Sequence, residues 1–233
     1  MYRRLDLSQI IQTNRVLCAR ISERFPRSGL LEVASEVLRV AEDSGRLCVW
    51  LARPLWFTRA LVVLAIGLIL LALVSVLPSL GRGAALSSSV ADLLQGFDAA
   101  VNEIILVGAA IYFLTRWEAH LKRARAMPAI HVFRSLAHII DMHQLTKDPE
   151  RVVRSGSPTK ASPVQSMSRF ELTRYLTYCS ELLAIVNKLG AITVQDFDDP
   201  QTLAAVDQVQ DLCGDLSQKI WHKIMILDMV ASG

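Results

Sequence analysis

The densest group of side chains that could do chemistry is a stretch rich in histidine and aspartate. It contains His131, His138, Asp141 and His143. On a helix the first three lie roughly on one face, whereas His143 points roughly 140° away from His138. A metal site needs three or more convergent ligands, and this helix supplies only His138 and Asp141 at a useful spacing. The sequence favours a local His138–Asp141 pair. The alternative is a metal or catalytic site completed by a residue from elsewhere.

A second informative residue is Glu103, which follows Asn102 in the otherwise apolar stretch 99–115. A carboxylate inside a membrane span costs a few kcal/mol at the bilayer centre and suggests a function. In a helix that begins near residue 98, Glu103 lies only about 8 Å from the start. It can then reach the headgroups or pair with Arg82. The alternative is a pore whose path is lined by Asn102 and Glu103 of several copies.

Other signatures of catalysis or redox chemistry are missing from the sequence. It contains no Walker A loop, no G-x-S-x-G elbow, no H-E-x-x-H pattern and no Rossmann glycine pattern. Its four cysteines are isolated and form no C-x-x-C pair, which indicates reduced, buried thiols. We therefore expect no resident cofactor, and a role other than catalysis is favoured.

The elements that carry these residues divide into charged and apolar segments. Residues 60–80 contain no charge, although 20% of the 233 residues are charged. A bilayer core about 30 Å thick needs roughly 20 apolar residues, so 59–80 is predicted to be a transmembrane helix. Residues 98–116 are predicted to be a second, less apolar span, with the basic and aromatic pair Arg116 and Trp117 at the interface. The connection 81–97 is then a short external loop.

Basic residues beside the two spans predict the orientation of the chain. Those expected to contact anionic headgroups are Arg53, Arg59, Arg116, Lys122 and Arg123. The connection between the spans offers only Arg82. Because Lys and Arg accumulate on the cytoplasmic side, both termini are predicted to be cytoplasmic, at a bacterial inner membrane. These segments lack aromatic platforms and recognition motifs, so no binding of nucleic acid is expected.

Outside the spans, apolar residues recur with helical spacing, which predicts an all-α cytoplasmic domain. Residues 1–58 are expected to form N-terminal helices with a break at Ser44–Gly45. Residues 117–148 are expected to form juxtamembrane helices that Pro128 kinks or restarts. Residues 149–168, rich in Pro, Ser and Thr, are predicted to be a flexible linker.

The last segment, 169–230, is predicted to be an antiparallel helical hairpin. At its turn, Asp199 is expected to cap the second helix and Pro200 to be its first residue. Apolar residues at alternating spacings of three and four form a seam for another helix. The seam includes Leu176, Leu183, Leu216 and Ile220. Two hypotheses stay open: packing on the other helices of this chain, or a seam shared with a partner.

These features together predict a helical membrane protein with two transmembrane helices and a cytoplasmic helical domain. The favoured function is that of a membrane-anchored, oligomeric interaction or assembly protein, which contacts the lipid bilayer and a second copy or another membrane protein. The alternative is a homo-oligomeric channel or transporter-like pore at Asn102 and Glu103. A third hypothesis is a metal-dependent membrane enzyme around His138 and Asp141.

Overall fold

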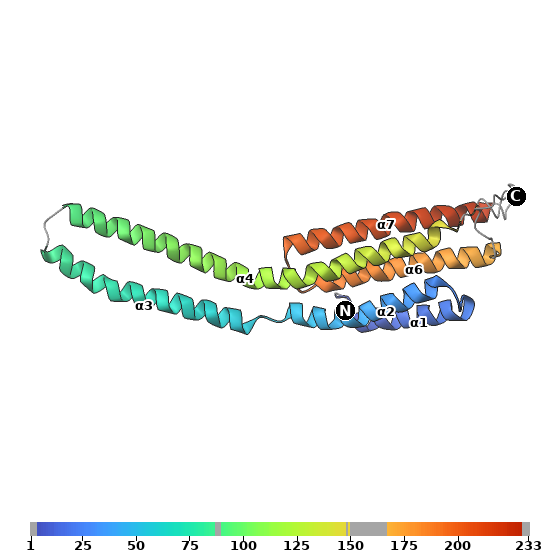
Figure 1. The fold of residues 1–233 in the computed structure, drawn as a ribbon, viewed down its shortest axis with the longest axis horizontal. Coiled ribbons are helices and arrows are strands. Elements are labelled where there is room, and N and C mark those ends of the chain that lie inside the picture. The colour runs from blue at the N-terminus through green and yellow to red at the C-terminus, as the bar shows by residue number, and fades with distance from the viewer. Residues whose placement is uncertain (1–3, 87–89, 148, 150–166, 230–233) are drawn as a thin grey trace. The chain divides into compact units, whose positions relative to one another are not determined.

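The computed structural model describes residues 4–86, 90–147, 149 and 167–229. Within these ranges only the backbone is described at 72–86, 90–97, 99–100, 103–104 and 114–115. All regular structure in these ranges is helical (Figure 1), which confirms the all-α class. The helices are α1 (Leu7–Arg24), α2 (Gly29–Ala52), α3 (Trp56–Leu86), α4 (Val90–Leu145), α6 (Arg169–Val194) and α7 (Pro200–Met229).

The chain divides into two compact units. The bundle unit comprises Met1–Ala52 and Arg123–Gly233, and the two-helix unit comprises Arg53–Lys122. Helix α4 contributes its first part to the two-helix unit and its last part to the bundle unit. Helix α3 ends at Leu86 and helix α4 begins at Val90, so both helices extend into the segment 81–97 that the sequence predicts to be an external loop.

Helix α1 begins where Asp6 accepts hydrogen bonds from the backbone N and the Oγ of Ser8, at 2.8 and 2.7 Å. This satisfies a free N–H at the helix start. One face of the helix is buried, with a spacing of three and four residues, as expected for an amphipathic helix. The buried residues are Ile10, Asn14, Leu17 and Ile21.

Helix α2 is continuous through Ser44–Gly45, so the break predicted there is wrong. The Ser44 hydroxyl donates to the Val40 carbonyl at 2.7 Å and thus stays within the helix. A Cβ on Gly45 would lie 3.1 Å from Cδ2 of Leu7, so the missing side chain lets α1 and α2 approach closely. This packing outweighs the low helix propensity of glycine, which costs about 1 kcal/mol.

Helix α4 also continues through Pro128, where the sequence suggested a kink or a restart. Proline removes the N–H that would bond to the carbonyl of residue 124. Ala124 and Pro128 are both exposed, so water can satisfy that carbonyl. Just beyond the proline, buried side chains hold the helix on the bundle core. They are Ile130, Phe133, Leu136, Ala137 and Ile140.

Capping residues define the ends of α6 and α7. Ser168 and Glu171 form a capping box at the start of α6. Residues 195–199 connect α6 to α7, and the Thr202 N–H donates to Asp199 Oδ2 at 3.1 Å. Asp199 is therefore the N-cap and Pro200 the first helical residue, as the sequence predicts.

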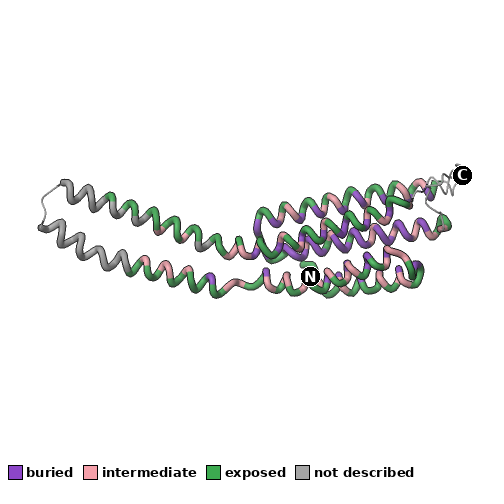
Figure 2. Tube along the Cα trace, in the orientation of Figure 1, coloured by how far each residue is buried: buried purple, intermediate pink, exposed green. Residues whose placement is uncertain are grey.

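One apolar core unites the helices of the bundle unit. Buried residues of α1, α2, α6, α7 and the last part of α4 form a single cluster (Figure 2). A smaller cluster contains Leu51, Ala126 and Phe197, with Leu47 and Trp50 packed against it. Since burial of one large apolar side chain contributes about 1.5–3 kcal/mol, this unit has its own source of stability.

Candidate functional site

The two-helix unit exposes a long apolar surface. Among the described residues, one helical stretch, within Gly29–Leu71, is long and apolar enough to cross a membrane. Its most apolar 18-residue window has a mean hydropathy of 2.1 and is only 6% buried. Figure 2 shows the described part of α3 as mostly exposed. The second predicted span, 98–116, lies in α4, but it stays a prediction because several of its side chains lie outside the description.

Aromatic and basic side chains gather near the start of α3 and around residue 115 of α4. Trp56 and Phe57 are 74% and 81% exposed. On α4 the guanidinium of Arg116 lies 5.4 Å from the ring centre of Tyr112, and the rings of Phe113 and Trp117 lie 5.3 Å apart. Such amphipathic groups are enriched where a membrane meets water.

Glu118 ties the start of α3 to α4 within the two-helix unit. Its carboxylate accepts hydrogen bonds from the Leu55 N–H at 3.3 Å and from Arg59 Nε at 3.2 Å, and it pairs with Lys122 Nζ at 3.1 Å. Burial raises the pKa of Glu118, but these three donors outweigh it, so the pKa lies below its ordinary value. Glu118 therefore stays ionised and fixes the two helix segments where the aromatic residues gather.

The five residues expected at anionic headgroups fall into two groups. Arg53, Arg59 and Arg116 are exposed, which leaves them accessible to a headgroup. Lys122 pairs with Glu118, and Arg123 pairs with Asp199. These ion pairs compete with lipid, as does the pair of Arg59 with Glu118 at 3.2 Å, whereas Arg53 and Arg116 can bind it directly. Binding of headgroups at all five positions stays a prediction.

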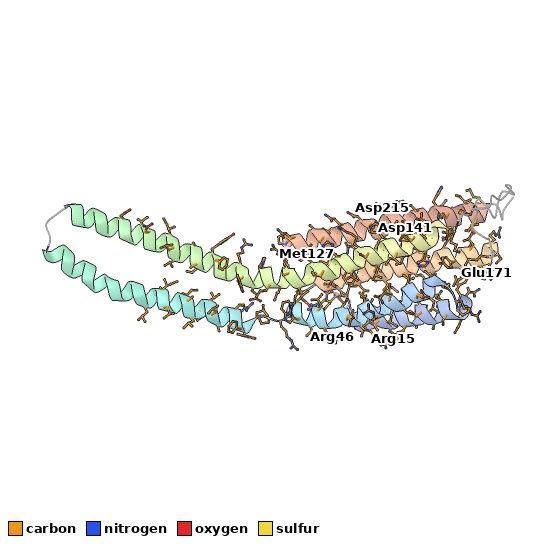
Figure 3. The ribbon with its side chains drawn as sticks, viewed as in Figure 1. Arg15, Arg46, Met127, Asp141, Glu171 and Asp215 are labelled. Atoms are coloured by element: carbon orange, nitrogen blue, oxygen red, sulfur yellow. The ribbon has the colours of Figure 1, made fainter. Side chains whose placement is uncertain are left out.

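The histidine-rich stretch forms the last part of α4. His131 and His138 are exposed, and Asp141, labelled in Figure 3, accepts a hydrogen bond from Gln144 Nε2 at 2.6 Å. The His143 ring packs on Gly29, where an added Cβ would lie 2.5 Å from its Cε1. In the described part of the chain, no three His, Cys, Asp or Glu side chains gather closely enough to hold a metal ion.

A lysine that sequence reasoning missed caps the C-terminal end of α4. Lys223 of α7 donates from Nζ to the carbonyl of Gln144 at 2.9 Å, to its Oε1 at 2.6 Å and to the carbonyl of Lys147 at 3.4 Å. Cations stabilise the free carbonyls at helix ends. The sequence shows only a lysine three residues after the seam residue Ile220, and does not show which helix end it reaches.

The predicted pore residues lie on α4. Asn102 is exposed, and the side chain of Glu103 lies outside the described residues. A pore lined by these two residues therefore stays a prediction.

The four seam residues lie in the core of the bundle unit. Leu176, Leu183 and Ile220 are fully buried and Leu216 is 3% exposed. They contact neighbours within this chain, which is the first of the two possibilities left open by the sequence.

The cysteines are unsuited to nucleophilic chemistry. Burial raises the pKa of Cys179 to about 12 and that of Cys213 to about 11, so both stay protonated thiols near neutral pH. Burial also raises the pKa of Cys18 and Cys48.

Sequence reasoning also missed a group of arginines around Tyr178. Arg20 of α1 and Arg174 of α6 lie over its ring, with their Cζ atoms 5.2 and 5.1 Å from the ring centre. The sequence shows only that Arg174 precedes Tyr178 by one helical turn; it contains no signal for the approach of Arg20, which lies more than 150 positions from Tyr178 along the chain.

Comparison of the chain with protein-family models, with curated proteins and with solved structures finds no match. Function is therefore inferred from the exposed apolar helix, the polar groups around it and the bundle unit.

Proposed function

We propose that the protein is a membrane-anchored interaction or assembly protein that works as an oligomer and has no catalytic activity. The exposed apolar surface of α3 carries this proposal, since its most apolar window has a mean hydropathy of 2.1 and is 6% buried. Exposure of apolar surface to water costs roughly 25 cal/mol per Å², so lipid or another protein must cover it. The length of α3, 31 residues, is ample for a bilayer core.

In this proposal the two-helix unit spans the bilayer twice and both termini are cytoplasmic, at a bacterial inner membrane. The exposed Trp56, Phe57 and Trp117 support a membrane–water interface at this level, because aromatic residues are enriched at such interfaces. The basic residues Arg53 and Arg116 support the cytoplasmic side, where Lys and Arg accumulate. The bundle unit, with α6 and α7 as its C-terminal hairpin, is then the cytoplasmic domain that contacts a second copy or another membrane protein.

The candidate catalytic residues make contacts that hold helices together, which supports an assembly role over the role of a metal-dependent enzyme. Asp141 accepts from Gln144, and Gln144 in turn accepts from Lys223, so this chain of polar groups holds α4 to α7. His143 fills the space above Gly29.

Membrane extraction tests the anchor. The wild-type protein should stay in the membrane pellet after washing with alkaline carbonate. A variant with Leu64→Asp and Leu68→Asp on α3 should lose stable insertion, because each central aspartate costs about 3 kcal/mol. The matched control is Trp221→Asp with Met225→Asp, which places the same charges on exposed apolar positions of α7. Loss of the control from the pellet, with retention of the α3 variant, would contradict the anchor.

Cysteine labelling tests the topology. In a chain with its native cysteines replaced, Ser88→Cys should react with an impermeant maleimide added outside intact cells, and Ser157→Cys should be protected. The reverse pattern would place the termini outside.

Purification in a mild detergent tests the assembly role. More than one copy per particle, or a stoichiometric partner, is expected, without conductance in planar bilayers. A monomer with no bound protein would contradict the proposal. A cation conductance that Glu103→Gln reduces would replace it with the pore formed by Asn102 and Glu103.

A further inference from the structure

Three arginines surround one tyrosine in the bundle unit. Arg20 and Arg24 come from α1, and Arg174 comes from α6. Two of them, Arg20 and Arg174, lie over the Tyr178 ring, with their Cζ atoms 5.2 and 5.1 Å from its centre. Burial raises the pKa of Tyr178, but the nearby guanidinium groups of Arg174, Arg24 and Arg20 outweigh it and lower the pKa. The guanidinium of Arg24 itself lies over the ring of Phe170, with its Cζ 5.1 Å from the ring centre. The buried Tyr178 thus holds two guanidinium groups against its ring, and Phe170 holds the third beside them.

The positive charge of this arginine cluster exceeds the negative charge beside it. Arg20 pairs with Glu181 at 3.0 Å. The carboxylate near Arg24 is Glu171, labelled in Figure 3, but it is engaged in capping α6, where it accepts from the N and Oγ of Ser168 at 2.8 Å. Within the described part of the chain, neither Arg24 nor Arg174 has a carboxylate within 4.0 Å.

Like charges held close together repel one another, so an oxyanion that bridges them gains Coulomb energy as well as hydrogen bonds. A guanidinium presents its donors in a planar fork that matches phosphate oxygens, and such charge-assisted bonds are about twice as strong as neutral ones. Arg24 is exposed and Arg174 is half-buried, so a ligand can reach both. The contacts with the rings of Tyr178 and Phe170 hold the forks in place before a ligand arrives.

A groove of about 940 Å³ follows α1 and α6. Of the three arginines Arg20 alone lines the groove, together with its partner Glu181, so the groove adjoins the cluster at Arg20. Its apolar lining includes Val16, Leu17 and Ile185, and its polar lining includes Thr13 and Lys188. Its volume is in the range of small-molecule sites, which are commonly 300–1,000 Å³.

We propose that the arginine cluster binds the phosphoryl group of a phosphate monoester, whose organic part lies in the groove between α1 and α6. The same chemistry occurs in a soluble phosphate monoester and in the headgroup of phosphatidic acid. This ligand site lies in the bundle unit and does not depend on the proposed membrane anchor.

Calorimetric titration of the full-length protein in a neutral detergent tests the site. The soluble probe is glycerol 3-phosphate, with potassium chloride at matched ionic strength as the blank. The lipid probe is a nanodisc that contains phosphatidic acid, compared with one that contains phosphatidylglycerol. Binding of glycerol 3-phosphate indicates a soluble ligand, and selective binding or stabilisation by phosphatidic acid indicates the lipid source.

The decisive variants are Arg24→Gln and Arg174→Gln, each of which should weaken binding about tenfold or more. The matched control is Arg15→Gln, on the same helix as Arg24 but paired with Glu42 at 2.7 Å, which should bind like the wild type. Circular dichroism melting shows whether each variant is folded. Arg24→Lys keeps the charge without the fork and should bind with intermediate affinity.

Two results would overturn the proposal. One is the absence of binding of both probes by the folded wild-type protein. The other is equal binding by the wild type and by a folded double variant, Arg24→Gln with Arg174→Gln.

Discussion

Arg123 and Asp199 form a bidentate ion pair that joins α4 to the N-terminal end of α7. Arg123 Nη2 lies 2.6 Å from Asp199 Oδ1, and Arg123 Nε lies 3.0 Å from Oδ2. The same carboxylate accepts the N–H of Thr202, so it caps α7 while it holds α4. Its side chain is only 4% exposed, which protects the pair from screening by salt.

Replacement of Asp199 should therefore destabilise the bundle unit through two separate losses, the ion pair and the helix cap. Asp199→Asn keeps an N-cap but loses the ion pair, whereas Asp199→Ala loses both. Loss of the cap alone costs about 1–2 kcal/mol. In chemical unfolding we expect the wild type to be the most stable, Asp199→Asn to be less stable and Asp199→Ala to be the least stable. Asp198→Ala, a change at the exposed neighbouring position, is the control and should have little effect. Equal stability of the Asp198 and Asp199 alanine variants would contradict this role.

The lowered pKa of Asp199 predicts how the stability of the bundle unit depends on pH. Burial raises the pKa of Asp199, but the hydrogen bonds from Arg123 and Thr202 outweigh burial and lower it from an ordinary value of 3.8. A lowered folded-state pKa stabilises the fold above the unfolded-state pKa, and this contribution is lost as the pH falls through the folded-state pKa. The stability difference between wild type and Asp199→Asn should thus be constant near neutral pH and shrink below about pH 4. Urea unfolding across this range measures it; a difference that grows on acidification would refute the assignment.

The buried seam predicts large effects of truncation. Leu183→Ala and Leu216→Ala should each cost about 2–5 kcal/mol, because they leave cavities in a packed core. The control is Leu145→Ala, at a position that is 61% exposed, which should be nearly neutral. Thermal unfolding in detergent makes the comparison. Unchanged stability of both buried variants would show that the seam is not packed as described.

The contact between Lys223 and the C-terminal end of α4 predicts that removal of the lysine lowers the stability of this end of the helix. Lys223→Met removes the donor to Gln144 and to the carbonyl of Lys147, and should cost about 1–3 kcal/mol because those groups lose a charged partner. Lys219→Met, one turn earlier on the exposed face of α7, is the matched control. Hydrogen exchange should rise in the last turn of α4 for the Lys223 variant alone. Identical exchange in the two variants would count against the cap.

The histidine-rich stretch makes a prediction about metal. His138→Ala should change stability by less than about 0.5 kcal/mol because the side chain is exposed. Asp141→Ala should cost more, since Gln144 loses its acceptor. Neither variant should show a metal-dependent phenotype. Stoichiometric zinc or iron that survives washing with a chelator and disappears in His138→Ala would establish the metal site.

Local regularities in the sequence determined much of this protein. Apolar residues at helical spacing marked the buried faces of α1 and α7, because each of these helices buries one side against the core. On α6 they marked the seam but not the further buried residues Tyr175, Leu182 and Ile185, because α1, α2 and α7 all pack against this helix. The Asp199–Pro200 pair marked the start of α7, since capping depends on residues within one turn. The charge-free stretch 60–80 marked the apolar helix in the same way.

Tertiary structure decided what local patterns do not contain. Ser44–Gly45 and Pro128 have low helix propensity, yet α2 and α4 continue through them because packing on the bundle core outweighs propensity. The pairing of Arg123 with Asp199, the reach of Lys223 to Gln144 and the gathering of arginines around Tyr178 depend on the rotation and axial shift of one helix against another. Those two quantities are set by how whole side-chain surfaces interlock, which is a property of the assembled core.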